Sequence, residues 1–178
     1  MTQQVILLRG INVSGKNKLK MADLRSGLEG LGFQGVATYV QSGNVVLKST
    51  VNPEESAAMI QAWIKEKFGY EVFVQAYANS TFRSILTKNP FVADLTKDPA
   101  FFHVTLLATD PQPWDALLDR RKGEEDLQVL GRTVYLYCPH GYGRTKLTNN
   151  DIERICKSSC TTRNWKTMNQ LQSMLDLE

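Results

Sequence analysis

The chain has 178 residues, of which 42% are hydrophobic and 22% are charged. This length holds one domain or two small ones with a buried core, and the composition is that of a globular protein. The absence of an 18-residue apolar run argues against a transmembrane helix, and the polar start argues against a signal peptide. Three cysteines, an odd number, indicate free thiols and a cytoplasmic location.

The net charge of +3 is too small to imply nucleic-acid binding by itself. Its distribution is uneven, because residues 1–50 hold six Lys or Arg against two acidic residues, and residues 131–178 hold seven against four. Residues 51–130 hold eight against twelve. Two basic ends therefore flank an acidic middle, and a solvated basic face is the commonest meaning of such a bias.

The first half alternates strands and helices in the order β-α-β-β-α-β. Asn52 is expected to cap the second helix, with Pro53 at its first position and Gly69 at its end. Hydrophobic periodicity and turn residues predict strand 5–8, helix 22–31, strands 36–40 and 45–48, helix 53–68, strand 70–77 and a short helix 81–86.

The second half shows a similar order. The pattern predicts strand 101–108, helix 113–121, a hairpin of strands 127–130 and 133–138, helix 149–157 and a last helix 165–175. The final strand of the first half has a shortened counterpart here or none. We therefore predict an α+β fold of two duplicated ferredoxin-like (split β-α-β) modules, residues 1–92 and residues 93–178, the second with a trailing helix.

Residues 9–20, RGINVSGKNKLK, contain G-x-x-x-x-G-K, which is close to a phosphate-binding P-loop. Asn17 stands where that loop needs a Ser or Thr hydroxyl for Mg²⁺, and the next helical pattern begins about a turn too late. We therefore set the P-loop aside.

The stretch recurs later in the chain. Residues 15–24 are GKNKLKMADL and residues 143–152 are GRTKLTNNDI, and each follows a strand and opens a helix. Basic side chains and backbone N–H groups at a helix start suit an anion. The alternative is structural: Leu19 and Leu147 fill the core, and Asp23 and Asp151 stabilise the first turn of each helix.

Four motifs carry a family resemblance: RGINVSGKNKL (9–19), YVQSGNVVL (39–47), GYGRTKLTN (141–149) and TTRNW (161–165). With them the chain resembles, over nearly its whole length, an uncharacterised bacterial family known as domain of unknown function 1697. The resemblance implies a duplicated α+β, ferredoxin-like fold and no activity. Ser14 stands where the family usually has Gly.

The motifs are rich in Arg forks, lysines and amides, which suit a phosphate or carboxylate. Alternatively, the Asn and Gln side chains satisfy loop backbone, which we favour for the residues at positions 44 and 164. We also expect Arg9, Lys16, Arg144 and Arg163 to line one concave surface. The candidate ligand-binding residues are Arg9, Asn12, Lys16, Lys18, Gln41, Asn44, Arg144, Lys146, Arg163 and Asn164.

Other chemistries find little support in the sequence. The spacing of Cys138, His140, Cys156 and Cys160 fits no common zinc site, so we expect no metal and no cofactor. No nucleophile–base pair or carboxylate pair can be assigned from spacing, and the catalytic residues of any enzyme therefore stay unknown. The strands VILLRG and NVVLKS lack the aromatic residues with which RNA-recognition modules stack bases.

The sequence thus favours a cytoplasmic binding protein for a phosphorylated or otherwise anionic ligand, with a nucleotide or a nucleic-acid phosphate backbone among the candidates. One alternative is an enzyme that acts on a phosphorylated small molecule. Another is a protein-interaction module without a ligand. No membrane partner is expected, and the sequence does not determine the oligomeric state.

Overall fold

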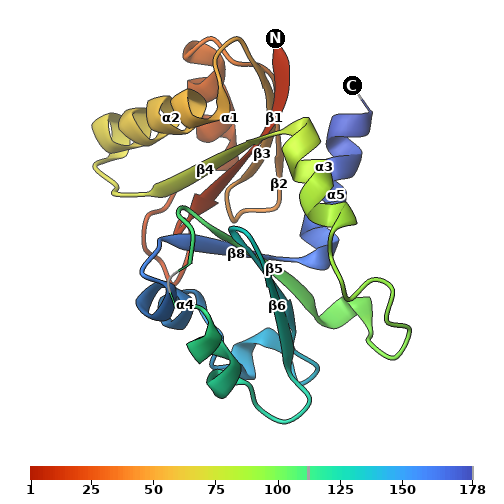
Figure 1. The fold of residues 1–178 in the computed structure, drawn as a ribbon. Helices are drawn as coiled ribbons and strands as arrows, with labels where there is room; N and C mark the ends of the chain where they lie inside the picture. Colours follow the sequence, from red (N-terminus) through yellow and green to blue (C-terminus); the bar gives the residue numbers. More distant parts are fainter. Residues whose placement is uncertain (112, 178) are drawn as a thin grey trace. The chain divides into compact units, whose positions relative to one another are not determined.

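The computed structural model describes residues 1–111 and 113–177. These residues form a mixed α+β protein with two four-stranded antiparallel sheets (Figure 1). In chain order the elements are β1 (Thr2–Arg9), α1 (Met21–Gly30), β2 (Gln34–Tyr39), β3 (Asn44–Ser49), α2 (Pro53–Phe68), β4 (Phe73–Ala78), α3 (Asn79–Thr87), η1 (Pro99–Phe101), β5 (Phe102–Leu107), η2 (Asp115–Arg120), β6 (Asp126–Leu130), β7 (Thr133–Tyr137), η3 (Tyr142–Arg144), α4 (Asn149–Cys156), β8 (Cys160–Asn164) and α5 (Trp165–Asp176).

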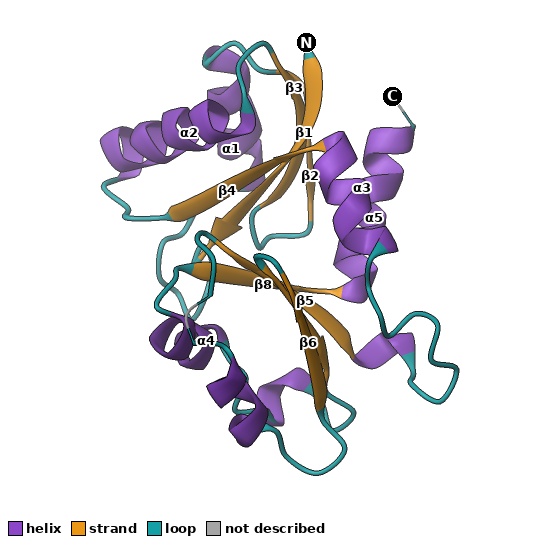
Figure 2. Cartoon of the chain, in the orientation of Figure 1, coloured by secondary structure: helices purple, strands orange, loops and turns teal. Residues whose placement is uncertain are grey.

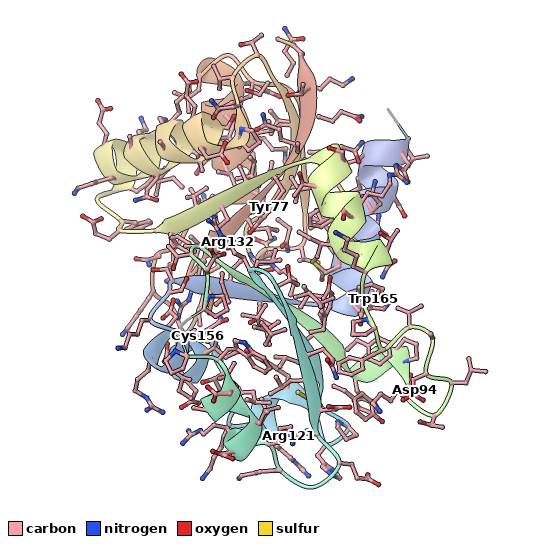
Figure 3. All side chains as sticks on the ribbon, viewed as in Figure 1. Tyr77, Asp94, Arg121, Arg132, Cys156 and Trp165 are labelled. Atoms are coloured by element: carbon pink, nitrogen blue, oxygen red, sulfur yellow. The ribbon has the colours of Figure 1, made fainter. Side chains whose placement is uncertain are left out.

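The chain divides into two compact units. Unit 1 is Met1–Ser84 with Gln170–Glu178, and unit 2 is Ile85–Asn169. The division falls inside α3 and inside α5, the helix that Trp165 begins (Figure 3). The domain boundary predicted between residues 92 and 93 stays a prediction.

Unit 1 is built on a sheet of strand order β2-β3-β1-β4, in which every neighbouring pair is antiparallel. Helices α1 and α2 lie against one face of this sheet (Figure 2). Because side chains alternate along a strand, Ile6 and Leu8 of β1 enter the core under these helices, whereas Arg9 leaves the strand on the other face. The first motif begins at Arg9, the last residue of β1.

The start of α2 confirms its sequence-based prediction. The Asn52 side chain accepts a hydrogen bond from Glu55 N at 2.8 Å, Pro53 opens the helix, and Gly69 ends it in the left-handed conformation at φ 72°. Each of these residues satisfies backbone groups that a helix end leaves without intrahelical partners.

The end of α5 belongs to unit 1. The Gln3 side chain of β1 donates to Leu175 O at 2.8 Å and accepts from Asn79 Nδ2 at 2.8 Å. Gln172 Nε2 in turn donates to Asn79 Oδ1 at 3.1 Å. These amide contacts tie the last turns of the chain to β1 and to the start of α3.

Unit 2 has a sheet of strand order β6-β7-β5-β8, again antiparallel throughout. Its apolar core includes Leu107 and Leu136 from the sheet and Ile152 and Cys156 from α4, the helix that Cys156 ends (Figure 3). The two sheets therefore share one strand order, each with a helix-covered face.

In this half, one possibility that the sequence left open is decided, and one expectation is wrong. The last strand is shortened but present, as β8, which pairs with β5 from Leu107↔Cys160 to His103↔Asn164. Its letters CTTRN lack the apolar alternation by which strands are recognised. The helix predicted over 113–121 is the 3₁₀ helix Asp115–Arg120, which has no side-chain cap at its start and too few residues for a stable α-helix.

None of the helices in the described residues combines the length and the apolar character that a membrane span requires.

Candidate functional site

The first basic loop, residues 10–20 between β1 and α1, is called loop 1. Its tip is a tight two-residue turn in which Lys16 N donates to Val13 O at 2.9 Å. Ser14 and Gly15 at the centre of the turn have φ of 50° and 76°, as a type I′ turn requires. Helix α1 begins only at Met21. Lys16 therefore lies on a hairpin-like tip and not at the mouth of a helix, which agrees with setting the P-loop aside.

Asn12 holds loop 1 in place. Its Oδ1 accepts from Leu19 N, and its Nδ2 donates to Leu19 O and to Gln41 O, each at 2.8 Å. Leu8 N also donates to Gly43 O at 2.8 Å. The first motif therefore contacts the second motif directly, and the amide of Asn12 is used by backbone groups.

Loop 1 presents exposed cations. Lys16, Lys18 and Lys20 are exposed, and none of them forms an ion pair with any residue in ranges 1–111 and 113–177. Lys20 is also the N-cap of α1 and makes no side-chain hydrogen bond to the helix. The N–H groups at the start of α1 thus have no capping side chain, and the dipole of the helix adds to the positive potential. Lys20 is not among the candidate ligand-binding residues predicted from the sequence. Its position next to the buried Leu19 could have indicated that it is an exposed cation like Lys18.

The second basic loop, residues 138–148 between β7 and α4, is called loop 2. The helix that follows it begins differently from α1, because a side chain caps its first turn. Thr148 Oγ1 accepts from Asp151 N at 3.3 Å and donates to Asp151 Oδ2 at 2.7 Å. Arg120 and Arg154 donate to Asp151 Oδ1 at 2.8 and 3.3 Å. The Thr148 hydrogen bond, followed by Arg154 and Arg120, lowers the pKa of Asp151. The start of α4 therefore already holds an anionic side chain.

Loop 2 also carries exposed cations. Arg144 and Lys146 are exposed and form no ion pair within the described part of the chain. Between them and the helix, Leu147 is fully buried, as Leu19 is in loop 1 at 2% exposure. The predicted burial of both leucines is confirmed, so the structural interpretation accounts for that part of the repeated pattern.

A polar seam joins the third and fourth motifs inside unit 2. Thr162 Oγ1 donates to Asn149 Oδ1 at 2.6 Å and lies 2.6 Å from Thr105 Oγ1. Beside it, the His103 ring stacks on Tyr142 with ring centroids 4.6 Å apart. Burial lowers the pKa of His103 and raises the pKa of Tyr142, so both side chains are neutral near pH 7. The seam fixes the start of α4 on the sheet, and sequence spacing did not reveal it.

The family described as "Protein of unknown function (DUF1697)" matches residues 1–135. The chain belongs to this family. The match includes the first two motifs and loop 1 and ends before loop 2. The comparison with curated proteins gives no match. Among solved structures, the chain is similar to a conserved bacterial protein from Streptococcus pneumoniae, with 24% identity, a TM-score of 0.74 and 98% of each chain covered. This likeness shows a shared fold and no function.

Two further predicted amides in this DUF1697 chain also serve the backbone. Asn44 is buried and donates to Tyr39 O at 3.1 Å and to Ser42 Oγ at 2.9 Å. Asn164 Oδ1 accepts from Thr167 N at 2.8 Å and so caps α5. These contacts are what the alternative interpretation of the two residues predicts, whereas the Gln41 side chain is exposed.

The two predicted arginines outside the loops are half-buried. Arg163 donates to Thr161 Oγ1 at 2.6 Å and to Thr162 O at 3.0 Å, and burial lowers the pKa of its guanidinium to about 10. Strand alternation places it on the face of β8 opposite Thr162, and therefore away from α4. The surface predicted to unite Arg9, Lys16, Arg144 and Arg163 stays a prediction.

Within the described residues, no group of three or more His, Cys, Asp or Glu side chains is placed to hold a metal ion. The three cysteines are buried and are not joined by disulfide bonds within the described residues. Burial, with a smaller effect of the Glu125 carboxylate, raises the pKa of Cys138 to about 11. A thiol in such an environment is a poor nucleophile near neutral pH.

Proposed function

We propose that this chain binds a phosphorylated or otherwise anionic ligand through loops 1 and 2. The proposal rests on the exposure of the basic side chains in these loops and on their lack of ion pairs in the described residues. Lys16, Lys18, Arg144 and Lys146 are exposed and make no ion pair within the described residues, although both loops belong to the motifs. Elsewhere, acidic side chains pair with Lys65, Arg83, Lys97, Arg120, Arg121, Arg132 and Arg154. Lys67 and Lys88 are also exposed without an ion pair in the described residues, but they lie outside the motifs.

The chemistry of the two loops supports an oxyanion such as a phosphate group. Lysine ammonium groups act as point charges, and the guanidinium of Arg144 offers a planar fork that matches two phosphate oxygens. In loop 1, the start of α1 adds backbone N–H groups without a capping side chain. A nucleotide or a nucleic-acid backbone has the phosphate groups that this arrangement suits.

The alternative of an enzyme has weaker support. His103 stacks on Tyr142 of loop 2 and burial lowers its pKa, but its ring is held in the seam, with Nδ1 3.4 Å from Phe101 O, and it is not among the exposed side chains of the loop. No contact within the described residues favours the alternative of an interaction module over ligand binding.

We also propose that the fold is a duplicated ferredoxin-like architecture and that the protein is cytoplasmic. The shared strand order of the two sheets and the order β-α-β-β-α-β in unit 1 support a duplicated ferredoxin-like architecture. Three cysteines without a disulfide in the described residues support a cytoplasmic location.

The test is a thermal-shift series with phosphate, pyrophosphate, ATP and a sugar phosphate. A ligand present at about 100 times its Kd stabilises the folded state by about 2.7 kcal/mol, so binding is readable as a shift in Tm. We expect the shift to diminish in K16A/K18A and in R144A/K146A. It should persist in the control K67A/K88A, which removes two exposed lysines outside the motifs. The proposal is wrong if no anion shifts Tm, or if all three variants shift like the parent.

A further inference from the structure

We infer that loop 1 docks on the phosphate backbone of duplex nucleic acid, without reading bases, through Lys16, Lys18 and Lys20. The inference rests on the proposed function and narrows its ligand class. The three lysines are exposed and without ion pairs in the described part of the chain. The segment 9–22 contains no acidic residue, so no side chain of its own sequence neutralises them.

The tip of loop 1 projects into solvent. Val13 is 56% exposed, and a Cβ placed at Gly10 or Gly15 would meet no atom within 4 Å. Sites for small phosphorylated molecules are concave and bury most of the ligand. A projecting turn that carries several cations suits instead a polymer with repeated charges, which remains largely outside the protein.

The lysines have a spacing that a charged polymer can use. Leu19 is buried at 2% exposure, and Lys18 and Lys20 are exposed on either side of it. Lys20 has extended backbone at φ −69° and ψ 137°, and two residues of extended chain span at most about 7 Å. The Asn12 side chain holds the backbone between the two lysines in place, because it accepts from Leu19 N and donates to Leu19 O. Duplex DNA carries one negative charge per about 1.7 Å of its axis, so several phosphates face these lysines at once.

The surrounding side chains favour a duplex over other polyanions. Proteins that bind single strands stack bases on aromatic side chains, and neither loop 1 nor the turn 40–44 contains an aromatic residue. Tyr70 donates to Lys18 O at 3.0 Å, but its ring is already stacked on Phe68. Binding to an anionic membrane needs substantial apolar insertion as well as charge. The exposed apolar residues of the two segments are Val13 and Val40, which offer little of it.

The test measures binding of the full chain to a short duplex of mixed sequence by fluorescence anisotropy over a salt series. Each lysine–phosphate contact contributes about −0.9 to the slope of log Kobs against log salt. We expect K16A/K18A/K20A to reduce the magnitude of that slope by about 2.7 and each single variant by about 0.9. K67A should leave it unchanged, and a second duplex of scrambled sequence should bind equally.

Several results of these measurements would oppose the inference. An unchanged slope in the triple variant overturns the inference. Binding to phosphatidylglycerol vesicles but not to duplex replaces it with a lipid surface, and tighter binding to a single strand than to the duplex contradicts the backbone mode. If pyrophosphate shifts Tm through loop 1 but the duplex does not bind, the inference fails while the proposed function stands. If neither binds, both fail.

Discussion

Loops 1 and 2 share a sequence pattern, but the molecule stabilises them by different means. In loop 1 an uncharged amide, that of Asn12, bonds the backbone at Leu19 and at Gln41. In loop 2 a charged network around Asp151 holds the start of the helix. The two loops therefore share a buried leucine with cations on either side of it. Their backbone conformations differ, because different neighbouring residues hold each loop in place.

The difference follows from the residues at the variable positions. Loop 1 places Asn12 and Asn17 in the left-handed region at φ 53° and 48°, which asparagine tolerates better than most residues. Loop 2 instead forms the 3₁₀ turn Tyr142–Arg144, and Thr148 supplies the hydroxyl that caps α4. Loop 1 is therefore expected to respond to loss of an amide and loop 2 to loss of a charge.

The largest effect is expected from Asn12→Ala. It removes three hydrogen bonds and places alanine at a positive φ, and together these changes lower the free energy of unfolding by about 2 kcal/mol or more. Asn17→Ala is a matched control, since Asn17 has a similar φ but a single side-chain bond, to Gly10 O at 2.9 Å. Urea denaturation should show a loss of only about 1 kcal/mol for this control. Equal losses in the two variants would contradict the role assigned to Asn12.

A smaller effect, dependent on pH, is expected from Asp151→Asn in the first turn of α4, the helix that follows loop 2. The folded state lowers the pKa of Asp151, so the stabilisation is present above the unfolded value of about 3.9 and is lost as pH falls through the folded pKa. The variant should lose about 1 kcal/mol near pH 7, and the difference from the parent should shrink below about pH 4. Denaturation curves at several pH values measure it.

Asp23→Asn is the control for that prediction, because Asp23 has the equivalent place in α1, is exposed and has no ion pair within the described residues. We expect it to change stability by less than about 0.5 kcal/mol at every pH. A difference between the Asp151 variant and the parent that is constant from pH 3 to pH 7 would contradict the charged network.

Much of the fold was predictable because its signals are local. Asn52, Pro53 and Gly69 determine the ends of α2 through hydrogen bonds and backbone angles within a few residues, and the sequence contains all of them. β8 was not recognised because its polar letters CTTRN become a strand by pairing with β5, where Thr162 bonds Thr105, 57 residues earlier in the sequence. Tertiary pairing, and not local pattern, makes this segment a strand.

The candidate site was predictable to a smaller extent. The repeat predicted the exposed cations and the buried leucines, because both follow from spacing around a helix start. It did not predict that Asp151 pairs with Arg120, since Arg120 comes from η2, far along the chain. Nor did it assign Asn12 to the Gln41 backbone, because that contact needs loop 1 to meet the β2–β3 turn.

The central claim is that both loops bind anions, and amide NMR tests it most directly. Pyrophosphate added to the ¹⁵N-labelled 178-residue chain should shift the backbone signals of residues 14–22 and 143–149 in a saturable way. The shifts at 14–22 should disappear in K16A/K18A while the signals of α2 stay in place. Saturable shifts confined to other segments, or no shifts at high pyrophosphate concentration, would contradict the account.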